Sequence, residues 1–165
     1  MRIYWTDILK KGNLGMMARP KGNDWLEDEI RALKNVEVNT IVSLLEKHEE
    51  ITLEITEEAF FCKKYDIEYI NFSIPDRGIP KEIDPFIALI THIDNQLKDH
   101  KKVIVHCRMG IGRTAMVVGA ILIKNGIDPE YVFEHLSKTR TLTVPDTEEQ
   151  KEWVKDQKKR FGYSK

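Results

Sequence analysis

Short runs of β-branched and aliphatic residues alternate with helical patterns along this chain, and this alternation restricts its fold more than any other feature. Strand-like runs occupy residues 3–5, 14–17, 40–45, 67–72 and 102–106. Apolar residues at helical spacing fill most of the sequence between and after these runs. Strands that alternate with helices predict an α/β fold, with a central, mostly parallel sheet and helices on both of its faces.

The helical segments carry start and stop signals at several of their ends. Asp24, followed by Glu27 three residues later, predicts a capping box. Asp84 predicts a cap for a helix with a proline in its first turn, and the pair Asn125-Gly126 predicts a helix end. We expect helices over residues 24–33, 56–65, 84–97, 113–124 and 128–139, and a last helix from residue 146 past Trp153.

Length, composition and charge exclude several classes of protein. The chain has 165 residues, 41% of them hydrophobic and 32% charged, and we expect one domain over residues 1–165. The formal net charge of −1 argues against a general binder of nucleic acid or anionic membranes, because such proteins carry a large basic excess. The nearly apolar run 115–123 is far shorter than the ~20 residues that span a bilayer, and the first residues do not resemble a signal peptide. We expect a cytoplasmic monomer with no nucleic-acid or membrane partner.

The most informative segment is a loop that follows the strand at residues 102–106. It reads His106-Cys107-Arg108-Met109-Gly110-Ile111-Gly112-Arg113-Thr114. The helix after it presents unpaired amides and a partial positive charge at its N-terminus, which together form an anion site. The same field lowers the pKa of a cysteine there, so we expect Cys107 to be largely thiolate near neutral pH and nucleophilic.

The middle of this loop suits a phosphate group. Gly110 and Gly112 allow a tight turn in which the backbone amides point inward at one phosphate. Arg108, Met109 and Ile111 are expected to contribute those amides, so their side chains can vary.

Three side chains at the ends of the loop have expected roles of their own. Arg113 carries a planar guanidinium group that can bind two phosphate oxygens at once and stabilise the charge of a transferring phosphoryl group. The hydroxyl of Thr114 is expected to hydrogen-bond the sulfur of Cys107 and help it leave. His106, at the end of a buried strand, is expected to orient nearby backbone and support the thiolate rather than act as a general base.

The pattern Cys-x5-Arg, preceded by His106 and followed by Thr114, resembles the signature of the protein tyrosine phosphatase superfamily. Members of this size are the compact dual-specificity phosphatases, and the resemblance covers most of the chain from about Trp25 onward. It implies a reaction through a cysteinyl-phosphate, with no metal and no cofactor, and an aspartate general acid on an upstream loop. Asp76 matches that aspartate, and would protonate the leaving oxygen and then act as base on the attacking water.

A further match to this family lies near the C-terminus. Gln150, in the stretch Asp146-Thr147-Glu148-Glu149-Gln150, is similar to a glutamine that the family places near the hydrolytic water. The turn before it departs from the family pattern: it reads Arg140-Thr141-Leu142 and is followed by one extra residue, which weakens the alignment of Gln150.

The function that these residues predict is hydrolysis of phosphotyrosine in a phosphorylated protein or peptide. Little chain remains to build deep recognition loops, so a shallow cleft would also admit phosphoserine and phosphothreonine. Two alternatives stay open: a phosphatase acting on a non-protein phosphate ester, and a non-catalytic module that binds phosphate or phosphopeptides. A phosphoinositide phosphatase would be expected to carry lysines in this loop, and the loop contains none.

The remaining titratable residues point to no second site. Cys62 follows Phe60 and Phe61 and is interpreted as inert packing, with a redox role toward Cys107 as the alternative. The other histidines lack the spacing of metal ligands, so no metal is expected; these are His48, His92, His100 and His135.

Overall fold

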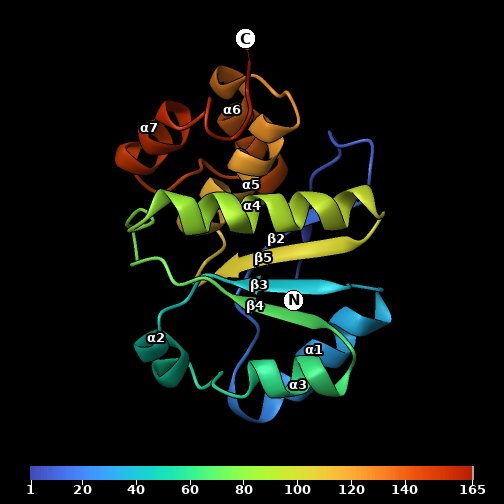
Figure 1. The fold of residues 1–165 in the computed structure, drawn as a ribbon. Helices are drawn as coiled ribbons and strands as arrows, with labels where there is room; N and C mark the ends of the chain where they lie inside the picture. The colour runs from blue at the N-terminus through green and yellow to red at the C-terminus, as the bar shows by residue number, and fades with distance from the viewer. Residues whose placement is uncertain (165) are drawn as a thin grey trace.

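Five strands form one mixed sheet in the computed structural model, which describes residues 1–164 (Figure 1). The strands are β1 (Tyr4–Trp5), β2 (Asn13–Ala18), β3 (Thr40–Ser43), β4 (Glu68–Asn71) and β5 (Lys102–Cys107). Their order is β1-β2-β5-β3-β4; β1 is antiparallel to β2, and every other neighbouring pair is parallel. The predicted, mostly parallel sheet is therefore confirmed.

Helices cover both faces of the sheet, as predicted. They are α1 (Leu26–Asn35), α2 (Lys47–Thr52), α3 (Glu58–Lys64), α4 (Ile83–Lys98), α5 (Gly112–Lys124), α6 (Pro129–Arg140) and α7 (Glu148–Asp156), with a short 3-10 helix at Asn23–Trp25. In Figure 1, α1 and α3 lie below the sheet, and α4, α5, α6 and α7 lie above it. Within residues 1–164, no helix is long and apolar enough to cross a membrane.

The alternation of side chains along β5 divides the interior into two cores. Val103, Val105 and Cys107 belong to the core beneath α4 and α5, whereas Ile104 belongs to the core of α1 and α3. Successive residues of a strand point to opposite faces, so His106 lies on the same face as Ile104. The nucleophile candidate and the histidine before it thus face different layers of the molecule.

Helix α5 passes through the centre of the upper layer. Every residue from Gly112 to Ile123 is buried, which explains the almost uninterrupted apolar sequence after the loop. The predicted end at Asn125-Gly126 is confirmed: Asn125 is the C-cap, and Gly126 has a φ of +89°, which glycine adopts without steric cost.

The first predicted helix start is wrong. Helix α1 begins at Leu26 after a 3-10 turn, and its N-cap, Trp25, makes no side-chain capping bond. The amide of Asn23 donates to the carbonyl of Glu54 at 2.8 Å, and this contact with a distant segment shapes the turn before the helix. Asp24 therefore does not cap it.

The predicted cap at Asp84 is also wrong. Helix α4 begins one residue earlier, at Ile83, and Glu82 is its N-cap. Asp84 instead lies in the first turn and accepts a hydrogen bond from Arg160 at 2.8 Å. A carboxylate in a first turn still interacts favourably with the positive end of the helix.

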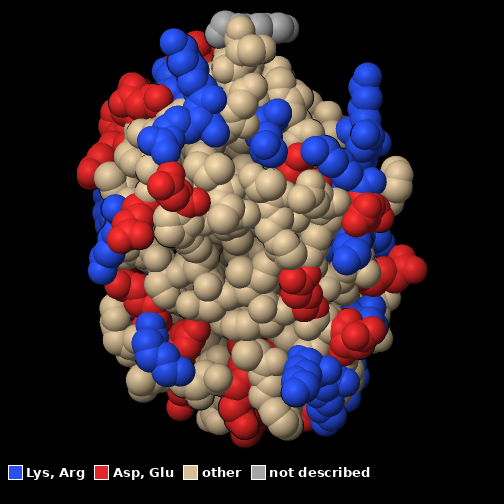
Figure 2. Space-filling view, in the orientation of Figure 1, with Lys and Arg blue, Asp and Glu red and all other residues tan. Residues whose placement is uncertain are grey.

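Charged side chains of both signs are interspersed around the face shown in Figure 2. The middle of this face, over α4 and the strands beside it, carries few of them. The mixture accords with the formal net charge of −1, and opposite charges placed close together cancel much of each other's field.

Candidate active site

The carboxyl ends of three parallel strands, β2, β3 and β5, meet at one edge of the sheet, and the Cys107 loop begins there. A cavity of about 230 Å³ opens at this edge. Its lining residues are Asp76, Arg77, Cys107, Arg108, Met109, Ile111, Gly112, Arg113 and Asp146. The structure therefore brings Cys107, Arg113 and Asp76 together, although Asp76 lies far from the other two in the sequence.

The loop is tightly turned, and its glycines are sterically required. Gly110 has a φ of +67°, and a Cβ there would overlap the backbone of Met17 at the end of β2. A Cβ on Gly112 would lie 2.7 Å from the Cβ of Asp146. Larger residues would push the loop away from the elements that hold it.

Three carbonyl groups of the loop accept hydrogen bonds from residues outside the loop. Arg140 of α6 donates from Nε to the carbonyl of Gly110 at 3.1 Å and from Nη2 to that of Met109 at 2.9 Å. The amide of Arg19 donates to the carbonyl of Arg108 at 3.3 Å. In a trans peptide the C=O and the following N–H point in opposite directions. The amides that follow these carbonyls therefore point away from Arg140 and Arg19, as a phosphate cradle requires.

Arg140 is itself held in place. It is 8% exposed, and its guanidinium lies 4.2 Å from the ring centroid of Tyr4 in a cation–π contact. Nothing in the sequence around Arg140 identifies it as a support for the loop, because its partners are carbonyl groups about 30 residues away.

The guanidinium of Arg113 is buried and clamped by Glu49 of α2. Nη1 donates to Oε2 at 2.7 Å and Nη2 to Oε1 at 2.9 Å, and Nη1 also donates to the carbonyl of Ile74 at 3.0 Å. Burial alone would raise the pKa of Glu49, but the hydrogen bonds and charge of Arg113, together with the backbone amide of Glu46, outweigh burial and hold that pKa below its ordinary value. The pair is therefore an ion pair with fixed geometry.

The sequence pattern predicts neither α2 nor the role of Glu49. One signal is visible in retrospect: Glu46 and Glu49 form a capping box at the start of α2, a pattern of polar residues three apart. That signal locates a helix, but it does not indicate that Glu49 faces inward.

Asp76 lies at the mouth of the cavity, in the loop between β4 and α4. Its Oδ1 accepts from Nη2 of Arg113 at 3.1 Å, while 53% of its side chain remains exposed. Beside it, Arg77 forms an ion pair with Asp146 at 3.1 Å. The carboxyl group thus faces both solvent and the floor of the cavity.

Gln150 lies behind the cavity rather than in it. Its Oε1 accepts from the amides of Asp146 and Thr147 at 3.1 Å, and its Nε2 donates to the carbonyl of Gly78 at 3.0 Å. The capping box of α7 uses this side chain, which is fully buried. The expectation that Gln150 lies near the hydrolytic water stays a prediction.

The predicted hydrogen bond from Thr114 to the sulfur of Cys107 is absent. Thr114 is the third residue of α5 and fully buried, and its Oγ1 has no hydrogen-bond partner among residues 1–164, the sulfur of Cys107 included.

The two cysteines occupy opposite sides of the sheet, and both are free. Cys107 borders the cavity, whereas Cys62 is enclosed in the core of α1 and α3. Burial and the nearby carboxylate of Glu58 raise the pKa of the Cys62 thiol far above its ordinary value. This environment is that of a packing residue.

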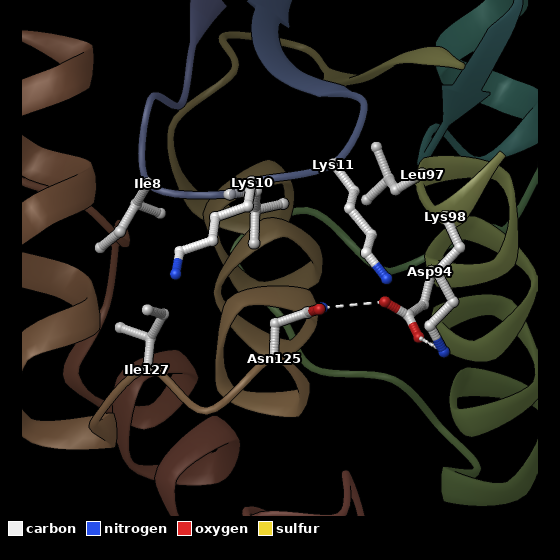
Figure 3. Close-up of a pocket in the computed structure, with 9 residues that line it drawn as sticks. Ile8, Lys10, Lys11, Asp94, Leu97, Lys98, Asn125 and Ile127 are labelled. Carbon is white, nitrogen blue, oxygen red and sulfur yellow. Dashed lines mark hydrogen bonds and ion pairs between the residues drawn. The ribbon is translucent and has the colours of Figure 1, made fainter. Parts of the chain in front are cut away.

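A second cavity, of about 340 Å³, lies at the other edge of the sheet (Figure 3). Lysines and aliphatic side chains line it, and Figure 3 shows the buried Asp94 bonded to Asn125 at 2.9 Å and Lys98 at 2.8 Å. It contains no cysteine, serine or histidine that could act as a nucleophile or base. Within residues 1–164, no group of three or more His, Cys, Asp or Glu side chains is placed to hold a metal ion.

Comparison with known proteins gives a consistent result. The model of a family described as "Polymorphic toxin system, DSP-PTPase phosphatase" matches residues 15–127, which include Asp76 and the whole Cys107 loop. A protein of Invertebrate iridescent virus 6, named as a tyrosine phosphatase, is 32% identical over 87 residues. These residues are 50% of this chain and 31% of the viral protein, so the chain spans about a third of the length of that relative.

Solved phosphatase structures share the fold. Kinase associated phosphatase, with its catalytic cysteine replaced by serine, has a TM-score of 0.90 at 18% identity, and the match covers 100% of this chain and 98% of that one. A phosphatase designated Tk-PTP, in its active form, has a TM-score of 0.76 at 22% identity, and the match covers 97% of this chain and 99% of the other.

Proposed function

The chain belongs to the DSP-PTPase phosphatase family, and from that premise we propose that it hydrolyses phosphotyrosine in proteins or peptides through a phosphocysteine intermediate on Cys107. The observation that carries the proposal is the convergence of Cys107, Arg113 and Asp76 on one cavity at the N-terminus of a buried helix. A nucleophile, a fixed cation and a carboxyl group are the parts that transfer of a phosphoryl group requires.

In the first step the phosphate group of the substrate binds to the backbone amides of the loop. The sulfur of Cys107 attacks phosphorus, and the bond from phosphorus to the substrate oxygen breaks. Asp76, as the carboxylic acid, donates its proton to that oxygen, so that the product leaves as a neutral phenol or alcohol. Its exposed position at the mouth of the cavity suits contact with a leaving group.

In the second step water attacks the phosphocysteine. Asp76, now a carboxylate, takes a proton from the water as the bond between phosphorus and sulfur breaks, which regenerates the thiolate and releases phosphate. Arg113 binds two phosphate oxygens throughout and stabilises the charge that develops on them.

The contact between Arg113 and Asp76 supports these roles. Glu49 already fixes the orientation of the guanidinium through two bonds, whereas Asp76 makes one bond at 3.1 Å and is half exposed. A bound phosphate would replace Asp76 on Nη2 without disturbing Glu49. The displaced carboxyl group would then lie beside the phosphate, where an acid is needed.

We extend the proposal to phosphoserine and phosphothreonine because the family model that matches residues 15–127 is that of DSP-PTPase phosphatases, and dual specificity includes these substrates. Hydrolysis of phosphotyrosine peptides with no turnover of matched phosphoserine and phosphothreonine peptides would limit the enzyme to tyrosine.

The decisive assay is hydrolysis of p-nitrophenyl phosphate in EDTA, with and without vanadate, by the wild-type protein and Cys107→Ser. The proposal predicts metal-independent turnover that vanadate inhibits and the substitution abolishes. Folded wild-type protein that binds phosphopeptides without turnover would instead be the non-catalytic module. Turnover of this small ester but of no phosphopeptide would indicate a non-protein substrate.

A further inference from the structure

A buried acid–base pair lies directly beneath the phosphate loop, on the opposite face of β5. His106 immediately precedes Cys107, and its Nε2 lies 2.8 Å from Oε1 of Glu58, the first residue of α3. The two side chains are 0% and 2% exposed. The mechanism above uses neither of them, although burial of an acid and a base is costly unless each compensates the other.

Both ring nitrogens of His106 face hydrogen-bond acceptors. Nδ1 lies 3.3 Å from the carbonyl oxygen of Cys107, and Nε2 faces the Glu58 carboxyl group. A carbonyl oxygen can only accept, so Nδ1 must carry a hydrogen in that contact. If Nε2 also donates, to an ionised Glu58, the ring is a doubly protonated imidazolium.

Glu58 directs its hydrogen bonding entirely to this ring. Its second oxygen, Oε2, is buried and has no hydrogen-bond partner among residues 1–164. Burial by itself would lower the pKa of His106, but the charge and hydrogen bond of Glu58, with smaller contributions from the Cys107 carbonyl and from Glu50, together outweigh burial and hold that pKa above its ordinary value.

The groups around the pair leave Glu58 as the dominant charge. From α3 and β4, burial and the Glu58 carboxylate raise the pKa values of Cys62 and Tyr69, so both stay neutral at ordinary pH. From α2, Glu50 adds a weaker negative charge that acts in the same direction on His106. On β2, the neighbour in register is Met17, which carries no charge.

We propose that Glu58 is a positioning residue that keeps His106 as an imidazolium, and that this charge favours the thiolate form of Cys107. The ring contacts the backbone carbonyl of Cys107 from the opposite face of β5, and charges interact more strongly in a buried environment than in water. The inference rests on the proposed function of Cys107 as nucleophile. It adds a third source of positive charge, beneath the loop, to the helix terminus and Arg113 above it.

The test compares Glu58→Gln with Glu57→Gln. Glutamine keeps the size and hydrogen-bonding capacity of Glu58 but removes its charge. Glu57 is the adjacent residue, is exposed and loses the same charge. In the pH profile of kcat/KM for p-nitrophenyl phosphate, the acidic limb should move to higher pH by about one unit in Glu58→Gln and stay in place in Glu57→Gln. A purely structural role would lower the melting temperature of Glu58→Gln and leave the limb unmoved, which would overturn the inference.

A second measurement depends neither on activity nor on the folding of a variant. ¹⁵N NMR of the wild-type protein reports whether one or both ring nitrogens of His106 carry hydrogen. Both should be protonated at about pH 7, above the ordinary histidine pKa of about 6.5. A neutral ring at that pH would overturn the inference even in an active enzyme. Wild-type protein without turnover would instead overturn the proposed function, while the NMR result would still determine the charge of the pair.

Discussion

Cys62 and Cys107 are exposed to almost the same small degree, 0% and 3%, on opposite faces of one sheet. Around Cys62 lie aliphatic side chains and the carboxylate of Glu58, both of which oppose a thiolate. Around Cys107 lie the N-terminus of α5 and the guanidinium of Arg113. Burial therefore does not distinguish an inert thiol from a candidate nucleophile; the charges and backbone groups that surround it do.

The largest effect on activity should come from replacing Cys107 by serine. Cys107→Ser should abolish turnover and still bind phosphate or vanadate, because it removes the nucleophile and leaves the loop amides in place. Steady-state assays and vanadate titration measure both properties. Residual activity within ten-fold of the wild type would show that Cys107 is not the nucleophile.

Removal of the proposed acid should have the next largest effect. Asp76→Ala should slow hydrolysis of phosphotyrosine peptides by roughly 10²–10⁴, and the loss should shrink for p-nitrophenyl phosphate, whose leaving group needs less protonation. Asp66→Ala, at another exposed loop aspartate, serves as the control. Equal losses on both substrates would contradict a role in leaving-group departure.

The ion pair between Glu49 and Arg113 should contribute to the stability of the folded protein. Glu49→Gln leaves a buried guanidinium without its counter-charge, and should lower the free energy of unfolding by about 3 kcal/mol near neutral pH. The pKa of Glu49 is lowered in the folded state, so this stabilisation is present above the ordinary glutamate pKa and is lost as pH falls through the folded value. Chemical denaturation at several pH values should therefore show the difference between variant and wild type shrinking in acid. A constant difference would contradict the ion pair.

A smaller effect, on the binding of vanadate, is expected from replacing Arg140, which bonds to two carbonyl groups of the loop. Arg140→Met removes two hydrogen bonds to loop carbonyls and should weaken vanadate inhibition about ten-fold, which corresponds to ~1.4 kcal/mol. Arg160→Met removes an exposed guanidinium that pairs with Asp84 and should leave inhibition unchanged. Equal inhibition constants for the two variants would mean that the loop keeps its shape without Arg140.

The smallest effect on activity should come from the second cysteine. Cys62→Ser should leave kcat/KM within about two-fold of the wild type, and it should lower stability by roughly 1–3 kcal/mol because it buries a hydroxyl in an apolar core. A large loss of activity with intact stability would indicate that Cys62 acts on Cys107, and would break the contrast between the two thiols.

The local parts of the site are predictable from the sequence. A β-branched strand, two glycines and an apolar helix identify the loop, and parallel strands bring their carboxyl ends to one edge. These signals locate the loop with Cys107 and Arg113, whereas Asp76 was expected from the resemblance to the phosphatase family; the structure brings all three to one cavity.

The supporting residues were not predictable in the same way. Glu49, Glu58 and Arg140 contact the loop across 64, 48 and about 30 residues of sequence. Each is a charged residue of a helix, and such residues usually face solvent. Their burial depends on how α2, α3 and α6 pack against the sheet. The same packing explains why the side chain of Gln150 bonds to Gly78 and to the start of α7.

The central claim is that phosphate is transferred to Cys107, and the most direct test is to find it there. Wild-type protein should be mixed with p-nitrophenyl phosphate, quenched rapidly in acid during turnover, digested and analysed by mass spectrometry. The account predicts one added phosphoryl group on the peptide that contains Cys107 and none on the peptide that contains Cys62. Turnover with an unmodified Cys107 peptide, or with the phosphoryl group on another residue, would contradict it.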